Sequence, residues 1–453
     1  MKYKVSKYIV KTDVLDDSDS LAKKIYFSTR TGSSFLIDKE TYTLMEKGEF
    51  IQIEEEILNK LIDFEYIVPS EIDEFKEIMN INRKGLKDSK TLSSIIQPTS
   101  NCQLGCGYCG QVHSKNTMSD SVTDKTIDRI ICKIKDKNYE SLKITWYGGE
   151  PLLGYSNILK ISNTLQEFTK SKGVHYSGVM ITNGLSLKPN IFKELYLKHN
   201  VYRFQITLDT TKDLHNKRRA TKEGVETFDL IINNILNIVN EEYYTALTDR
   251  PIFIRMNIDK SNYQEVEKFI DYLSDLGLSD KVDIHFAPIV NWGQEKAGDE
   301  FGLTKELFAE LEIEWYLYAM KKGFTFGYFL PKRDYNSCMV VMEDAEVYDA
   351  FGNILPCYEF SYTPFYDKDE YKIGTVFQKE KDLTYDIPIR NWYDHLENGE
   401  SYCINCNLLP VCNGACPKKW LNKEVGCPEF KLNIEDKLVL QYLMDKSNIK
   451  EII

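Results

Sequence analysis

The sequence predicts an α/β protein: a partial (β/α)6 barrel, with a small α+β module before it and a loop-rich region after it. Three observations predict this fold class. Short apolar strands alternate with amphipathic helices over residues 92–300, residues 1–85 have a strand-and-helix pattern of their own, and seven of the 11 cysteines lie between Cys338 and Cys427. A chain of 453 residues is too long for one compact core, so we expect domains at 1–85, 92–300 and 301–453.

The composition is that of an ordinary globular protein, with 42% hydrophobic and 28% charged residues. A formal net charge of −12 argues against a nucleic-acid-binding surface, and the basic run "HNKRRATK", residues 215–222, predicts a solvated face. The N-terminal "MKYKVSKYIVKTD" has no signal-peptide core, and no apolar run is long enough for a membrane span. We therefore expect a cytoplasmic protein without a membrane partner, and its odd number of cysteines argues against a disulfide framework.

Residues 1–85 predict a winged-helix-like module. "KYKVSKYIV" has the pattern of a strand, and "KKIYFSTRTGSSFLID" that of a hairpin turning at Thr31-Gly32. Helical patterns follow at residues 40–47, 54–64 and 70–80. The polar stretch "NRKGLKDSK", Asn82 to Lys90, predicts a linker to the next domain.

Residues 92–300 predict a parallel sheet with helical crossovers, which suits a partial TIM-like barrel. Helix 123–135 has isoleucines on one face, and Trp292, just after the last strand, is a candidate for the cavity mouth. In such barrels the chemistry lies at the C-terminal ends of the strands. The expected strands are Ser94–Thr99, Lys143–Tyr147, Gly178–Thr182, Arg203–Leu208, Ile252–Ile258 and Asp283–Pro288.

A loop with three cysteines, "SNCQLGCGYCGQ", follows the first of these strands. Three thiolates suit a [4Fe–4S] cube that leaves one iron free. The flanking glycines allow a tight loop to wrap an inorganic core. The alternative is a zinc site completed by a distant ligand such as His113.

The C-x3-C-x2-C spacing of Cys102, Cys106 and Cys109 resembles the radical S-adenosylmethionine (SAM) superfamily, as do "YGGEP" at 147–151, "ITNG" at 181–184 and "ITLD" at 206–209. In that family the open iron chelates SAM, and reductive cleavage yields a 5′-deoxyadenosyl radical that abstracts hydrogen. The resemblance implies that an aromatic ring packs near the adenine, that the glycine-glycine-glutamate motif holds the amino group, and that further residues meet the methionine or ribose. The implied SAM-binding residues are Tyr108, Gly148, Gly149, Glu150, Asn183, Thr207 and Arg219.

The loop-rich region of residues 301–453 resembles the SPASM domain of radical SAM enzymes that modify peptides and proteins. Its spacing is C-x13-G-x4-C, then C-x2-C-x5-C-x3-C, then a last cysteine. The resemblance implies two auxiliary [4Fe–4S] clusters, and hence three clusters in all. Two structural zinc sites are the alternative, and Cys132, on a helical pattern, is expected to be a buried thiol. The implied ligand sets are Cys403, Cys406, Cys412 and Cys427 for one cluster, and Cys338, Cys357 and Cys416 for the other, with an open iron or a non-cysteine fourth ligand.

The resemblance also implies a polypeptide substrate. The N-terminal module resembles the recognition element that binds the leader of a precursor peptide as an added strand. Our leading hypothesis is a radical SAM oxidoreductase that installs an intramolecular thioether or carbon–carbon cross-link, with a flavodoxin- or ferredoxin-type protein as electron donor. The alternatives are a sulfatase maturase, which makes formylglycine, and a non-catalytic zinc or iron–sulfur peptide-binding protein.

One departure weakens the maturase alternative. Such maturases have an aspartate base directly after the cysteine of G-x4-C, whereas "GNILPCYEF" places Tyr358 there and Glu359 next. In an extended segment, a shift of one residue would move the carboxylate to the other face. Glu359 is the candidate proton acceptor.

Overall fold

A computed structural model describes residues 2–14, 23–291 and 296–448, so Trp292 lies outside the described residues. The N-terminal module holds two small antiparallel sheets, β1–β5 and β2–β3–β4. The hairpin turns where the sequence predicted, but "KYKVSKYIV" forms two short strands in different sheets. The elements are β1 Tyr3–Val5, β2 Ile9–Lys11, β3 Lys23–Ser28, β4 Ser33–Asp38, α1 Lys39–Lys47, α2 Glu55–Asp63, β5 Ile67–Pro69 and α3 Glu74–Lys87.

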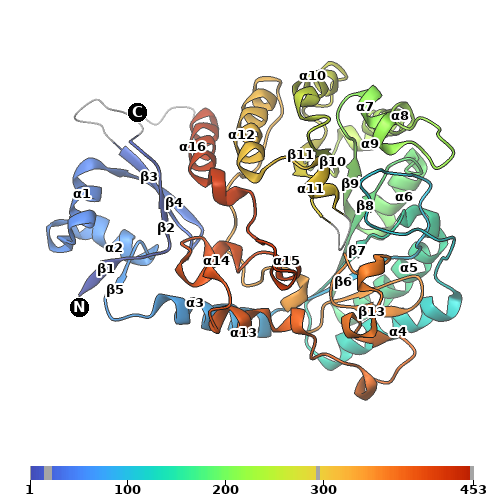
Figure 1. The fold of residues 1–453 in the computed structure, drawn as a ribbon, viewed down its shortest axis with the longest axis horizontal. Coiled ribbons are helices and arrows are strands. Elements are labelled where there is room, and N and C mark those ends of the chain that lie inside the picture. Colours follow the sequence, from blue (N-terminus) through green and yellow to red (C-terminus); the bar gives the residue numbers. More distant parts are fainter. Residues whose placement is uncertain (1, 15–22, 292–295, 449–453) are drawn as a thin grey trace.

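The predicted linker is wrong, because residues 82–87 are the last part of helix α3. The Asn82 side chain is fully buried and donates to Asn413 Oδ1 at 2.7 Å. Gly85 lies against the ring of Tyr335, where a Cβ would approach within 2.3 Å. Long-range packing therefore sets the end of this helix, and Figure 1 shows α3 running beneath the C-terminal segment.

The middle of the chain forms six parallel strands in the order β6–β7–β8–β9–β10–β11. All six overlap the predicted strands, although β6 begins and ends three residues earlier than predicted, and helices lie on one side (Figure 1). Alternating burial along β6 and β7 places one face against helices. The elements are β6 Thr91–Ile96, α4 Asp120–Asp136, β7 Ser141–Trp146, α5 Tyr155–Lys172, β8 His175–Thr182, α6 Pro189–His199, β9 Val201–Thr207, α7 Lys212–Arg219, α8 Phe228–Val239, α9 Glu242–Thr245, β10 Ile252–Ile258, α10 Val266–Asp275, β11 Asp283–Pro288, α11 Ala297–Phe301 and α12 Lys305–Lys321.

The C-terminal segment is loop-rich, yet it extends the barrel sheet, which sequence reasoning missed. Strand β12 pairs in parallel with β6, and β13 and β14 follow antiparallel, giving nine strands in this sheet. Val347 and Tyr348 of β12 are fully buried. The elements are β12 Glu346–Tyr348, β13 Asn353–Leu355, β14 Gly374–Thr375, α13 Trp392–Glu397, α14 Leu409–Cys412, α15 Pro417–Leu421 and α16 Phe430–Asn448.

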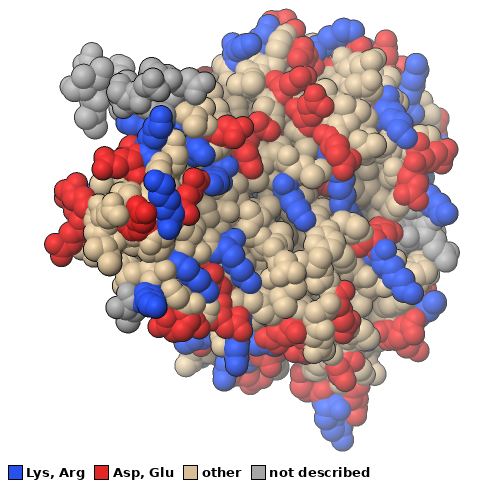
Figure 2. All heavy atoms as spheres, turned by 60° about the vertical axis from the view of Figure 1, so that its left-hand side comes forward, with Lys and Arg blue, Asp and Glu red and all other residues tan. Residues whose placement is uncertain are grey.

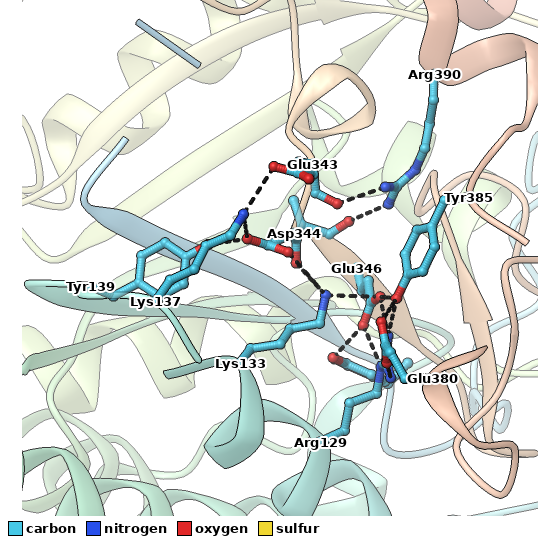
Figure 3. A network of polar contacts seen from close by, with 12 residues as sticks. Arg129, Lys133, Lys137, Tyr139, Glu343, Asp344, Glu346, Glu380, Tyr385 and Arg390 are labelled. Carbon is cyan, nitrogen blue, oxygen red and sulfur yellow. Dashed lines mark hydrogen bonds and ion pairs between the residues drawn. The ribbon is translucent and has the colours of Figure 1, made fainter. Parts of the chain in front are cut away.

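An ion-pair network fastens β12 to helix α4 (Figure 3). The fully buried carboxylate of Glu346 accepts two hydrogen bonds from Arg129, at 2.6 and 2.7 Å, and lies 2.9 Å from Lys133 Nζ. Arg390 donates to the carbonyls of Glu343 and Ala345 at 2.7 Å. Two cations thus offset the burial of one carboxylate, and the C-terminal segment is held in register with the barrel.

The N-terminal module packs directly on the C-terminal cysteine loops. Thr29 Oγ1 donates to the Asn407 carbonyl at 2.6 Å, and the Asn407 side chain donates to the Ile9 carbonyl at 3.1 Å. Phe27 of β3 shares an apolar cluster with Leu408 of that loop. The module is therefore part of the wall around Cys406 and Cys412.

Charges of both signs are scattered over the face seen in Figure 2, whose middle is mostly uncharged. Within the described ranges, no helix is both long and apolar enough to cross a membrane.

Candidate active site

The three-cysteine loop lies at the C-terminal end of β6, among the ends of the neighbouring parallel strands. Cys102 is buried, and Cys106 and Cys109 are half-buried. The loop is held by backbone hydrogen bonds to the segment after α7, from Gly105 N to the Ala220 carbonyl and from Lys222 N to the Gln103 carbonyl, both 3.0 Å. The three thiols are thus presented at the edge where barrel chemistry takes place.

"YGGEP" follows β7 and touches the cysteine loop. Gly148 has a φ of +112°, and Glu150 N donates to the Asn101 carbonyl at 2.7 Å. A Cβ on Gly149 would lie 2.4 Å from the Asn101 carbonyl oxygen. Both glycines are needed because the two loops are in backbone contact.

The Glu150 side chain is fully buried and accepts three hydrogen bonds from neutral donors. These come from Thr182 Oγ1 at 2.6 Å, Asn183 N at 2.7 Å and Leu152 N at 3.1 Å. Burial raises the pKa of this carboxyl despite those bonds. Among the described residues no Lys, Arg or His nitrogen lies within 4.0 Å of it, so its geometry suits a cationic ligand group.

Over the residues that the structure describes, Arg219 has no carboxylate partner, just as Glu150 has no cationic one. Arg219 is 6% exposed, and its guanidinium donates to Tyr108 OH at 2.6 Å, while its Nε has no partner. No carboxylate in the described part of the chain lies within 4.0 Å of it. Asn257 also donates to Tyr108 OH, at 3.1 Å. A ligand with an ammonium and a carboxylate, such as the methionine end of SAM, would match Glu150 and Arg219 together.

The run "HNKRRATK" is not the solvated face that the sequence predicted. His215 is fully buried, and Arg218 lies 5.0 Å from the Tyr108 ring centroid while pairing with Asp209 at 3.1 Å. Partners from other elements bury these charges, which a local pattern does not reveal. Asn257 and Arg218 were missed for that reason.

Asn183 and Thr207 end neighbouring strands. Asn183 Nδ2 lies 3.8 Å from Cys102 Sγ, and Thr207, the last residue of β9, is 8% exposed. The alternative ligand His113 has its Nε2 4.0 Å from Cys109 Sγ, and burial lowers its pKa. Cys132 is exposed rather than buried, because the packed face of α4 is formed by Ile127, Ile130 and Ile134.

The C-terminal cysteines gather in two adjoining pockets. One pocket is lined by Cys403, Cys406, Cys412 and Cys427, and the other by Cys338, Cys357 and Cys416, with Cys427 at its rim. These are the two sets that the resemblance implied. The described residues hold no His, Cys, Asp or Glu group placed to bind a single metal ion; in a cubic cluster each thiolate binds a different iron.

The segment after Cys357 is a turn, not the extended segment that the sequence suggested. Phe360 N donates to the Cys357 carbonyl at 3.1 Å. The Tyr358 ring faces Tyr147 of "YGGEP", and Glu359 is paired with the buried Lys418. The carboxylate is therefore held by Lys418, and it lies close enough to Tyr147, Cys357 and Cys416 that its charge adds to burial in raising the pKa of each.

Comparisons with known proteins agree with this geometry. Residues 96–245 match the model of the Radical SAM superfamily. The chain is 25% identical over 367 residues to a cysteine-type anaerobic sulfatase-maturating enzyme of Clostridium novyi, covering 75% of this chain and 90% of that protein. It is 24% identical over 437 residues to the radical SAM cyclopropyl synthase TigE of Paramaledivibacter caminithermalis, covering 86% and 85%.

Two solved structures are similar in fold. Native anSMEcpe with bound AdoMet has a TM-score of 0.56 at 19% identity, covering 79% of this chain and 100% of that one. Streptococcus suis SuiB bound to precursor peptide SuiA has a TM-score of 0.50 at 16% identity, covering 94% and 98%. The chain is a radical SAM enzyme. Its cofactors are SAM and a [4Fe–4S] cluster, and the matched residues include the three-cysteine loop, Glu150 and Arg219.

Proposed function

We propose that this enzyme matures a ribosomally made precursor peptide by closing an intramolecular thioether or carbon–carbon bond. The observation that carries the proposal is the contact between Tyr147 and Tyr358, whose ring centroids are 5.5 Å apart. Through it, the SAM loop and the turn after Cys357 share one wall. A peptide at the barrel mouth would therefore meet both the hydrogen-abstracting chemistry of SAM and the second cysteine set.

At the SAM site, Cys102, Cys106 and Cys109 would hold the cluster. Glu150 would accept hydrogen bonds from the amino group, Arg219 would attract the carboxylate, and Tyr108, Asn183 and Thr207 would contact the remaining parts of the cofactor. Gly148 and Gly149 would allow the backbone to approach it.

Two auxiliary [4Fe–4S] clusters complete the proposal. The pocket with Cys403, Cys406, Cys412 and Cys427 offers four thiolates, which would saturate a cluster. The pocket with Cys338, Cys357 and Cys416 offers three, and would leave one iron for a substrate thiolate or another ligand.

The electron balance of the reaction requires an electron acceptor, and the auxiliary clusters would serve as that acceptor. Joining two groups of a peptide removes two hydrogens: one leaves as an atom to the SAM-derived radical, the other as a proton with one electron. That electron must leave the substrate, and the auxiliary clusters would accept it.

The N-terminal module, residues 1–85, would bind the leader of the peptide in the manner of a winged-helix recognition element. Among the described strands, β4 pairs only with β3 and leaves its other edge free. Phe35 and Leu36 on β4 are 41% and 37% exposed. An extended leader could add to this edge as a further strand.

A second candidate is formylglycine formation in a protein substrate, favoured by the similarity to the Clostridium novyi maturating enzyme over 90% of its length. Against it, Tyr358 stands where those maturases have aspartate, and Glu359, the remaining candidate base, is paired with Lys418.

The test is anaerobic incubation of the iron-replete enzyme with SAM, dithionite and the short peptide encoded beside its gene. We expect a mass loss of two hydrogens and tandem-mass fragments that stay joined. A product that reacts with a hydrazine and fragments normally would support formylglycine instead. Unchanged peptide alongside 5′-deoxyadenosine release would contradict the proposal.

A further inference from the structure

Cys427 is the one cysteine common to both C-terminal cysteine pockets, and polar side chains point at its sulfur from the protein surface. Tyr402 OH lies 2.9 Å from Cys427 Sγ, and Lys431 Nζ lies 3.7 Å from it. Lys431 also lies 4.7 Å from the centroid of the Tyr402 ring. Such a hydroxyl and ammonium stabilise a thiolate and the electron density of whatever it binds.

Exposed apolar side chains surround this sulfur. Tyr402 is 47% exposed, Val425 is 53% exposed, and Leu432, next to Lys431, is 47% exposed. Cys427 itself is half-buried, whereas Cys403 of the same set is buried. The surface beside Cys427 therefore carries an apolar patch, formed by Tyr402, Val425 and Leu432.

Lysines form the rim of the patch. Lys305 Nζ donates to the carbonyls of Val425 at 3.0 Å and Cys427 at 2.8 Å. Lys419 lies close enough to Lys305 for the two charges to repel, and Glu429 and Glu306 are the nearest carboxylates to Lys305. Within the described ranges, Lys305, Lys419 and Lys431 form no ion pair with any carboxylate. Ammonium groups without carboxylate partners are available to a negatively charged protein, although the whole chain carries −12.

We propose that Tyr402, Val425, Cys427 and the lysines 305, 419 and 431 form the docking surface for a small acidic one-electron carrier protein of the flavodoxin or ferredoxin class. The proposal rests on the proposed function, because four thiolates would saturate a cluster and leave it electron exchange rather than substrate binding. In each encounter the cluster would lose the one electron that it took from the substrate and the oxidised carrier would gain it, with no proton or group transferred. An apolar centre with a charged rim is typical of small, transient redox interfaces.

The test measures binding of an oxidised acidic flavodoxin to the iron-replete enzyme by calorimetry at low salt. The double variant K305E/K419E should raise the Kd by roughly tenfold or more, and the neutral variant K305M/K419M by less. K170E makes one such charge change at the exposed end of barrel helix α5 and should leave the Kd unchanged. Added salt should weaken wild-type binding and have a smaller effect on K305E/K419E.

An unchanged Kd in K305E/K419E, or an equal rise in K170E, would overturn the docking surface. Iron content and dithionite-driven release of 5′-deoxyadenosine are measured on every variant. Wild-type enzyme that never releases 5′-deoxyadenosine with dithionite would count against the proposed function. Normal release by the wild type, together with an unaltered flavodoxin Kd in K305E/K419E, would reject the docking surface alone.

Discussion

The ring of Tyr358 meets the ring of Tyr147 edge to face, with their centroids 5.5 Å apart and their planes at 84°. Gln97, just after β6, also donates to the Tyr358 carbonyl at 3.3 Å. The contact joins "YGGEP", the proposed SAM-binding motif, to the turn after Cys357, so the C-terminal segment packs directly against this loop of the barrel.

Truncation of this ring should uncouple SAM cleavage from peptide modification. In Tyr358→Ala we expect 5′-deoxyadenosine release to persist while modified peptide per 5′-deoxyadenosine falls about tenfold, because small misplacements of substrate cost large factors in rate. Tyr358→Phe keeps the ring and should behave like wild type. Parallel loss of both products in Tyr358→Ala would show that the ring instead supports the SAM site. Both products are quantified by liquid chromatography with mass spectrometry.

Glu150→Gln should weaken SAM binding by roughly 10- to 100-fold, the size of one charge-assisted hydrogen bond. The amide group cannot accept from the three donors as the carboxylate does, and it removes the charge that faces an ammonium. Glu140→Gln, at an exposed position before β7, is the matched control. Equilibrium dialysis with labelled SAM measures the Kd, and wild-type affinity in Glu150→Gln would refute the assignment.

Gly149→Ala should displace the cysteine loop. The new Cβ would lie 2.4 Å from the Asn101 carbonyl oxygen, whereas a Cβ on Gly105 would meet only Lys222 at an ordinary 3.8 Å. We expect Gly149→Ala to lose about four irons per chain, out of the roughly twelve that the three proposed clusters would hold, and Gly105→Ala to keep them. Iron is measured by colorimetric assay after anaerobic reconstitution. Full iron content and SAM cleavage in Gly149→Ala would show that the loop can move at little cost.

Much of this site follows from the sequence because its residues sit at the ends of strands whose alternation is regular. The positions of Cys102, Glu150, Asn183 and Thr207 needed only the strand order and the motifs. The places of Arg218 and Asn257 in the site could not be predicted in this way, because they depend on tertiary contacts with Tyr108. Likewise, the sequence predicts a linker at Asn82, but the structure shows it buried and hydrogen-bonded to Asn413, more than 300 positions away.

Strand β12 was missed for a similar reason. It is three residues long, too short for a period to be visible, and it is stabilised by Glu346 meeting two cations of α4. A short sequence pattern does not predict partners that come from another part of the chain.

Arg129→Met should therefore lower the free energy of unfolding by about 3 kcal/mol, since it leaves the fully buried Glu346 with Lys133 as its one cation beside the Tyr348 hydroxyl. Lys125→Met removes an exposed pair with Asp128, 3.6 Å apart on the same helix, and should cost under about 1 kcal/mol. Urea unfolding followed by tryptophan fluorescence compares the variants. Equal midpoints would mean that the network contributes little to stability.

His215 should make the protein sensitive to acid. Its ring is fully buried between the Asp209 amide, at 3.1 Å from Nδ1, and Thr227 Oγ1, at 3.1 Å from Nε2. Burial, together with the charges of Arg219 and Arg218, lowers the pKa of His215 to about 3, against about 6.5 in an unfolded chain. As the pH falls below about 6.5, His215 therefore becomes protonated in the unfolded state but stays neutral in the folded state.

From pH 7 to pH 5.5 this one group should lower the free energy of unfolding by about 1.3 kcal/mol, with no contribution above pH 7.5. His215→Gln cannot take up that proton, so it should be less stable at pH 7 yet lose less between pH 7 and pH 5.5. His175→Gln, which changes an exposed histidine, should keep the wild-type slope. Urea midpoints at the two pH values provide the measurement. An unaltered slope in His215→Gln would place the acid sensitivity elsewhere, because only a group that titrates differently in the two states can produce it.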